Sequence, residues 1–175
     1  MSEQYTLAGQ GLKKVFIGQI LCIFALIPIV GAILAVIGYV FHMLGLNTAS
    51  KTHPGFKTAF TVAIASLVVA ILSIFLPFLS VVTTILGLVE CYYICTTSSE
   101  MLSSKGDATL AATGLSVWKM YMICIIVVVV CTILAFVPIL GILAAIVLVI
   151  ASIVLIVAGI RYIIFIYKAQ ESLQI

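Results

Sequence analysis

The chain has 175 residues, of which 65% are hydrophobic and 7% charged, whereas about a quarter of the residues in a typical soluble domain are charged. This composition excludes a water-soluble globular protein and indicates an integral membrane protein with a single transmembrane domain, residues 1–175. The net charge of +3 is small and no Lys-rich or Arg-rich run is present, which excludes nucleic acid as a partner.

Three long segments contain no Lys, Arg, Asp or Glu: residues 15–50, 58–89 and 120–160, which are 36, 32 and 41 residues long. As single helices they would measure about 48–62 Å, whereas the hydrocarbon core of a bilayer is about 30 Å thick. Even a helix tilted by about 40° needs only about 39 Å of its length to cross that core. Each segment is therefore too long to be one transmembrane helix.

One proline stands near the middle of each segment: Pro28, Pro77 and Pro138. Proline lacks a backbone N–H and pushes the preceding residue out of helical geometry, so it favours the end of a helix. We therefore predict an all-α polytopic membrane protein in which six transmembrane helices form three hairpins that turn at the prolines. The predicted hairpins cover approximately residues 12–50, 57–102 and 115–168.

The Lys and Arg residues favour this topology, because all eight lie near the predicted open ends of the hairpins. Cytoplasmic loops of membrane proteins are enriched in Lys and Arg. We therefore expect the protein in the plasma (inner) membrane, with both termini cytoplasmic and the proline turns on the outer side. The aromatic residues expected to mark the cytoplasmic interface are Trp118, Tyr121, Tyr162, Phe165 and Tyr167.

Alignment of the three segments on their prolines shows an internal repeat, with small residues at offsets that share one helical face. The repeat predicts a pseudo-threefold arrangement of the hairpins. Small residues let helix backbones approach closely in a membrane, so they predict packing faces. The residues expected to pack in this way are Gly31, Ala35, Gly38, Gly45, Gly87 and Gly141.

Glu90 is an acidic residue inside an apolar segment, where an ionised carboxylate is costly unless it is paired. The expected partner is either Lys14 or His42, because both are predicted at a similar depth. One interpretation is a functional group that handles a solute or a proton. The alternative is a structural ion pair that lies close enough to the cytoplasmic surface to reach water.

Other polar residues are predicted at the depth of Glu90, since His42, Cys91 and Ser152 stand at the same offset from the three prolines. His42 is interpreted either as a proton-handling group or as an interhelical hydrogen-bonding residue. Cys91 and Cys95 lie four residues apart, but two thiols and a distant histidine are a poor match to a metal site. No metal and no other cofactor is therefore predicted.

Motifs of membrane enzymes are missing from the sequence, which contains no HExxH, no CxxC and no paired aspartates. The chain is therefore predicted not to be an enzyme. The segment Gly9-Gln10-Gly11 superficially matches a phosphate-binding loop, but no strand precedes it. We interpret it as a flexible segment that leads into the first helix.

Two proline turns, Leu76-Pro77-Phe78 and Phe136-Val137-Pro138, are followed by glycines at Gly87 and Gly141. This layout resembles that of the small bacterial six-helix hairpin-repeat membrane proteins of the acid-resistance HdeD type. The resemblance implies a hairpin-repeat fold and assigns no functional residues. The size and helix number are also similar to those of the substrate-binding subunits of energy-coupling-factor vitamin transporters, although the Ala-x-x-x-Ala motif of their first helix is absent here.

We therefore expect a small non-enzymatic integral membrane protein of an accessory or stress-related type. The alternative is a transporter or channel subunit that works through a polar layer around Glu90 and His42. A third interpretation is a hairpin protein that shapes the membrane, which the first hairpin fits best because only 13 residues separate Lys14 from Pro28. The expected partners are the lipid bilayer and either a second copy of the chain or another membrane protein.

Overall fold

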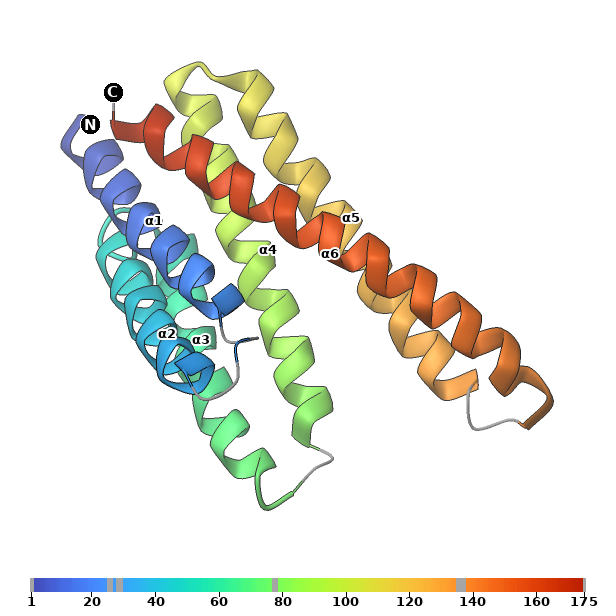
Figure 1. Ribbon diagram of the computed structural model, residues 1–175. Coiled ribbons are helices and arrows are strands. Elements are labelled where there is room, and N and C mark those ends of the chain that lie inside the picture. The colour runs from blue at the N-terminus through green and yellow to red at the C-terminus, as the bar shows by residue number, and fades with distance from the viewer. Residues whose placement is uncertain (1, 25–26, 28–29, 77–78, 135–137, 175) are drawn as a thin grey trace.

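The structure, a computed structural model, describes residues 2–24, 27, 30–76, 79–134 and 138–174, and it describes their side chains except within 132–145. In these residues the fold is all-α, as predicted, with six helices (Figure 1). The helices are α1 Ser2–Ile23, α2 Val30–Ala49, α3 Pro54–Ser73, α4 Leu79–Lys105, α5 Ala108–Leu134 and α6 Pro138–Gln174.

Five of the six helices, α2 to α6, are long and apolar enough to cross a membrane. Their apolar side chains are widely exposed, for example Val36 at 66% and Ile156 at 64%, which suits lipid rather than water as the surroundings. Helix α1 is not among the five. Its apolar part within the described residues, 15–23, would extend only about 14 Å as a helix, less than half of a bilayer core.

Helix α1 begins ten residues earlier than the first hairpin was predicted to begin, so the interpretation of Gly9-Gln10-Gly11 as a flexible segment is wrong. Gly9 and Gly11 are buried inside the helix. A Cβ at Gly9 would lie 2.7 Å from Cγ of Gln174 on α6, and one at Gly11 would lie 2.7 Å from the Ala49 amide nitrogen on α2. Close packing against two other helices therefore accounts for both glycines.

The helices also extend beyond the predicted ends of the third hairpin, because α5 begins at Ala108 and α6 continues to Gln174. Two of the predicted turn residues, Pro28 and Pro77, lie outside the described residues. Helix α6 begins at Pro138, a position where proline costs nothing because the first N–H of a helix has no intrahelical partner.

Capping residues define the two turns at the charged end of the molecule. His53 precedes α3, and its Nδ1 accepts a hydrogen bond from the Gly55 amide at 3.2 Å. Gly106 follows α4 with a φ of 101°, the left-handed conformation that suits glycine. Asp107 then caps α5, because its Oδ1 accepts from the Leu110 amide at 3.0 Å. Both turns are consequently short and locally specified.

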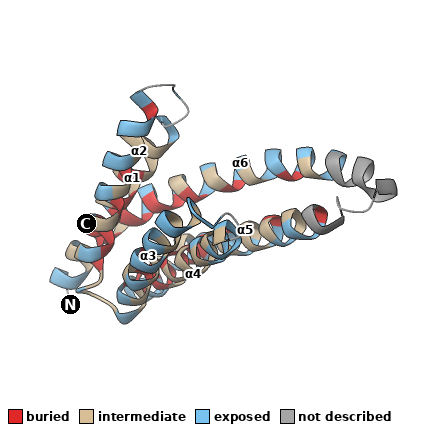
Figure 2. Ribbon diagram, turned by 90° about the horizontal axis from the view of Figure 1, so that it is seen from below, coloured by how far each residue is buried: buried red, intermediate tan, exposed pale blue. Residues whose placement is uncertain are grey.

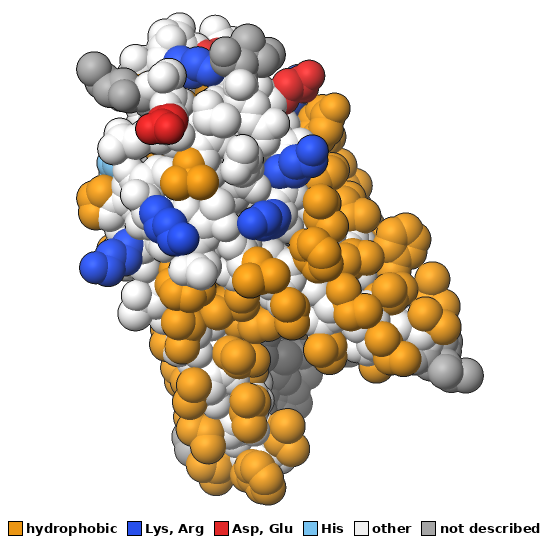
Figure 3. Space-filling model, turned by 90° about the vertical axis from the view of Figure 1, so that its left-hand side faces the viewer, with side chains coloured by type: hydrophobic (Ala, Val, Ile, Leu, Met, Phe, Trp, Pro, Cys, Tyr) orange, Lys and Arg blue, Asp and Glu red, His pale blue; other side chains and the backbone are white. Residues whose placement is uncertain are grey.

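Consecutive helices pack in pairs, α1 with α2, α3 with α4 and α5 with α6, and α1 also packs on α6 and α4 on α5. Both ends of the chain lie at one end of the molecule (Figure 1). From there the pair α5–α6 diverges from the other helices, and Figure 2 shows α1–α2 diverging in a third direction. In Figure 3 the charged side chains gather at the common end, and hydrophobic side chains cover the rest of that face.

Glycines bring α1 and α2 into backbone contact. A Cβ at Gly38 would lie 2.7 Å from the Gly18 carbonyl oxygen, and one at Gly45 would lie 2.6 Å from the Gly11 carbonyl oxygen. Gly31 on the same face of α2 is also buried, and Ala35 is half-buried. The predicted small-residue face of α2 therefore packs against Gly11 and Gly18 of α1, which were not predicted to be packing residues.

Gly87 differs from the other glycines predicted to pack, and for it the prediction is wrong. A Cβ at this position would meet nothing within 4 Å. Gly141 lies in α6, outside the residues whose side-chain surroundings are described.

The core lies in the half of the molecule that carries the charges. Among the described residues, the largest fully buried side chains come from α1, α2, α3, α4 and α6. They include Leu12, Leu46, Phe56, Ile94 and Phe165. Phe165 and Tyr162 were expected at the membrane interface, but they are 1% and 8% exposed and belong to this core. Tyr167 is 46% exposed, with its ring centroid 5.4 Å from that of Phe16.

A candidate intramembrane site

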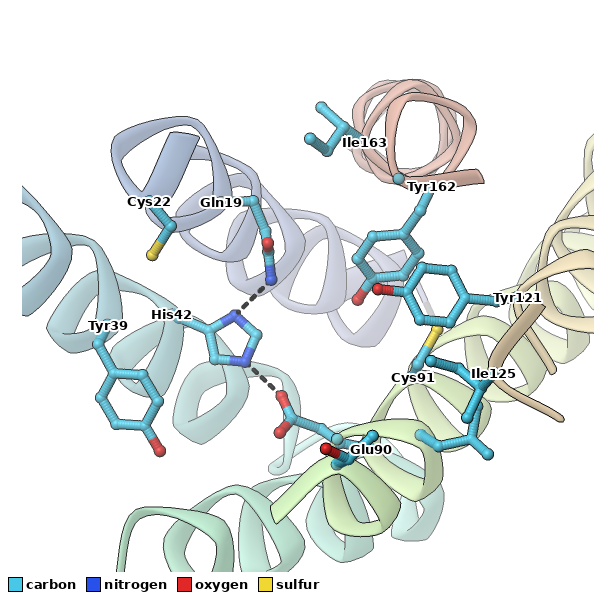
Figure 4. A pocket seen from close by; sticks show the side chains of 14 residues that line it. Gln19, Cys22, Tyr39, His42, Glu90, Cys91, Tyr121, Ile125, Tyr162 and Ile163 are labelled. Carbon is cyan, nitrogen blue, oxygen red and sulfur yellow. Dashed lines mark hydrogen bonds and ion pairs between the residues drawn. The ribbon is translucent and has the colours of Figure 1, made fainter. Parts of the chain in front are cut away.

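A cavity of about 410 Å³ lies between the three helix pairs, each of which contributes residues to its lining. Residues of α1, α2, α4, α5 and α6 line it. Figure 4 shows Gln19, His42, Glu90, Tyr121 and Tyr162 directed toward a shared centre, whereas Tyr39 and Cys22 are directed away from it. Its size falls within the range of small-molecule sites in proteins. The cavity brings together polar groups from segments that are distant in the sequence.

His42 of α2 and Glu90 of α4 meet at the wall of this cavity (Figure 4). The imidazole Nε2 contacts the carboxylate Oε1, and the two side chains are only 8% and 13% exposed. Helix α2 packs on α1 and α3, whereas α4 packs on α3 and α5, so the pair reaches between two helices that belong to different hairpins. Of the two partners considered for Glu90, the structure places His42 in contact with it.

Gln19 of α1 holds the other nitrogen of the imidazole. Its amide Nε2 donates to His42 Nδ1 at 3.4 Å. An Nδ1 that accepts a hydrogen bond places the proton on Nε2, which then donates to Glu90. Both nitrogens of the imidazole are therefore engaged, one by a residue of α1 and the other by a residue of α4.

Three tyrosines also line the cavity: Tyr39, Tyr121 and Tyr162. The Tyr39 hydroxyl donates to the Ala63 carbonyl oxygen on α3 at 2.9 Å, which ties the wall to a helix behind it. The rings of Tyr121 and Tyr162 lie together, with centroids 6.5 Å apart. Aromatic faces and hydroxyl groups therefore border the same space as the carboxylate.

Two glycines leave the cavity open. Gly87 of α4 and Gly159 of α6 both line it, and a Cβ at either position would meet nothing within 4 Å. At these two positions the absence of a side chain creates space, whereas between α1 and α2 it permits contact. The volume of the cavity therefore depends on these residues.

Cys91 lines the cavity, and its Sγ lies 4.0 Å from that of Cys95. All five cysteines are free thiols. Among the described residues no group of three or more His, Cys, Asp or Glu side chains is arranged to hold a metal ion.

Two of the predicted polar residues lie elsewhere. Lys14 donates from Nζ to the Thr48 Oγ1 at 3.2 Å, nearer the charged end, and it does not line the cavity. Ser152 is exposed, and its hydroxyl donates to the Leu148 carbonyl oxygen of its own helix. The α6 residues that line the cavity with His42 and Glu90 are Gly159, Tyr162 and Ile163, so the predicted grouping of Ser152 with His42 and Glu90 is wrong.

Sequence reasoning missed Gln19 and the three tyrosines as members of the site. Tyr121 and Tyr162 were assigned to the membrane interface, where tyrosine is common. Gln19 had a signal that we did not use, since it is a polar residue inside the first charge-free segment. No family model matches the chain, and neither a curated protein nor a solved structure matches it. The proposals below therefore rest on the geometry of the site.

Proposed function

We propose that this protein binds and transports a small solute within the membrane, through the cavity around His42 and Glu90. The observation that supports the proposal is the position of the pair. A purely structural ion pair is best placed in a packed interface, because its charges are then held against each other. Here the carboxylate and the imidazole line a cavity of about 410 Å³ that two glycines leave open.

The proposed orientation follows from the charges. They gather at the end of the molecule that contains both termini, so this end is placed in the cytoplasm and the apolar helix ends are placed toward the outer side. The membrane is proposed to be the plasma (inner) membrane. The role is non-enzymatic in this proposal, because solute binding alone accounts for the groups that line the cavity.

Filling the cavity tests the proposal directly. Gly159→Leu places a side chain in open space, and Val157→Leu is the matched control because Val157 is 45% exposed on the same helix. The purified protein is screened with cationic, anionic and neutral small molecules, since a bound ligand raises the melting temperature. We expect ligands that stabilise the unmodified protein and Val157→Leu and that leave Gly159→Leu unaffected. Equal stabilisation of both variants would place binding outside the cavity.

Glu90→Gln separates a solute site from a structural ion pair. In the proposed function the variant remains folded and loses ligand binding and transport in reconstituted vesicles. If the pair is only structural, the variant would instead keep its ligand response. That result would favour an accessory role in which the pair holds the hairpins together.

A further inference from the structure

The charges that the cavity can carry are few and well defined. Among its described lining residues, Glu90 is the acid and His42 the base, and neither lysine nor arginine is present. Lys14 is bonded to Thr48, and Arg161 is exposed. The remaining ionisable groups that line the cavity are thiols and phenols: Cys22 of α1, Tyr39 of α2, Cys91 of α4, Tyr121 of α5 and Tyr162 of α6. From α3 a backbone carbonyl binds the Tyr39 hydroxyl.

The net charge of the site therefore depends on one proton. With a protonated imidazole the pair is neutral overall, whereas with a neutral imidazole the carboxylate leaves the site with one negative charge. An unbalanced carboxylate inside a membrane is costly and attracts a counter-ion. Histidine is the side chain that changes its charge between about pH 5 and 8.

We propose that the cavity accepts an organic monocation in exchange for the proton of His42. This inference rests on the proposed function and names its class of substrate. The cation takes the negative charge of Glu90, and the imidazole proton leaves to water, so one proton is released for each cation bound. The site is overall neutral before and after the exchange.

The lining selects an organic cation over a metal ion. Three tyrosine rings border the space, and aromatic faces attract organic ammonium groups. Leu88, Ile125 and Ile163 supply apolar contacts for the carbon groups of such a ligand. A hard metal cation instead requires about six or more oxygen ligands. The described residues that line the cavity do not provide such a set of ligands.

Gln19 suits the two states of the imidazole. Its amide nitrogen donates to Nδ1 of the neutral ring. After rotation of the amide, its carbonyl oxygen accepts from the Nδ1–H of the protonated ring. Gln19 is therefore a positioning residue that keeps His42 directed at Glu90 in both states.

The charge preference of the cavity is measured at Cys91, which lines it. A single-cysteine chain keeps Cys91 and replaces the other four with alanine: Cys22→Ala, Cys95→Ala, Cys124→Ala and Cys131→Ala. The rate at which the Cys91 thiol reacts is measured with two methanethiosulfonate reagents. One carries a cationic trimethylammonioethyl group and the other an anionic sulfonatoethyl group. In each case the thiolate displaces methanesulfinate and forms a mixed disulfide, so the ratio of rates cancels the thiolate fraction.

The ratio is normalised to that of an exposed cysteine, Thr113→Cys, in the chain without other cysteines. We expect the normalised ratio at Cys91 to favour the cation roughly tenfold or more at about pH 8 and to fall toward the control at about pH 6. Glu90→Gln should abolish the preference at both values. His42→Gln should make it independent of pH.

The unmodified protein gives a second measurement that needs no cysteine substitution. Calorimetric titration with benzyltrimethylammonium, whose charge does not change with pH, should show tighter binding at about pH 8 than at about pH 6. At about pH 6, titrations in buffers of different ionisation enthalpy should show that up to about one proton is released for each cation bound.

The outcomes distinguish the two proposals. If Cys91 reacts with the neutral methyl methanethiosulfonate but shows no preference for the cation, the cavity is accessible and the proposed cation exchange is wrong. If no reagent reaches Cys91 and benzyltrimethylammonium does not bind, both the exchange and the proposed function are wrong. A preference for the cation that Glu90→Gln removes and that rises with pH supports both.

Discussion

Glu90 is an acidic side chain with little exposure and a basic side chain beside it. Its side chain is 13% exposed, so little water reaches the carboxylate, and His42 contacts one of its oxygens. Removing one partner of a buried pair leaves the other charge unbalanced, which costs more than removing both. This asymmetry makes the contribution of the pair measurable even where its net effect on stability is small.

We predict that His42→Ala lowers the free energy of unfolding by about 3 kcal/mol or more, because it leaves Glu90 without its partner. Combining it with Glu90→Leu should recover a large part of that loss. The measurement is a double-mutant cycle of unfolding in detergent. Strictly additive effects of the two substitutions would show that the side chains do not interact in the folded protein.

At the scale of elements, glycine has two opposite roles in this protein. Between α1 and α2 it permits carbonyl oxygens to approach the facing backbone, as at Gly38 and Gly45. Along the cavity, Gly87 and Gly159 face open space. The same substitution should therefore have opposite consequences at the two kinds of position.

Gly38→Ala is predicted to destabilise the protein by about 1–3 kcal/mol, because the added Cβ would lie 2.7 Å from the Gly18 carbonyl oxygen and would push α1 from α2. Gly87→Ala is the matched variant, and it should be neutral or stabilising by up to about 1 kcal/mol, since alanine favours a helix and meets no neighbour here. Thermal unfolding of the two variants checks the prediction. A similar loss of stability in both would contradict it.

The helices themselves were predictable, because charge-free segments longer than a bilayer must fold back on themselves. The ends of the helices were not predictable, because hydropathy identifies only the apolar part of a helix. Helices α1, α5 and α6 continue from that part into polar sequence. Polarity also identified His42 and Glu90, which are conspicuous in apolar surroundings. It could not place Ser152, Tyr121 or Tyr162, because their positions depend on how α5 and α6 pack against the other helices.

At the scale of the whole molecule, charge and packing coincide. The core, the capped turns and the charged side chains all lie at one end, and the exposed apolar side chains lie beyond it. Lys105 Nζ donates to the Ser172 carbonyl oxygen, and the Ser172 hydroxyl donates to Asp107 Oδ2 at 3.2 Å, which joins the turn between α4 and α5 to the end of α6. These bonds hold the α4–α5 turn against the end of α6 at the charged end of the molecule.

The proposed topology predicts which positions a membrane-impermeant thiol reagent reaches from outside intact cells. Single cysteines placed beside Pro28, Pro77 and Pro138 should react, whereas Thr113→Cys at the charged end should be protected. Permeabilised cells provide the control, because Thr113→Cys should then react. Protection of all three proline positions would instead favour hairpins that enter the inner leaflet without crossing.

In the proposed membrane orientation, acyl chains of the surrounding lipid lie between the helix pairs, which diverge away from the charged end. The length of those chains then acts on the angle between the hairpins, and with it on the separation of α2 from α4. Bilayer thickness is therefore expected to tune how firmly imidazole and carboxylate are held together.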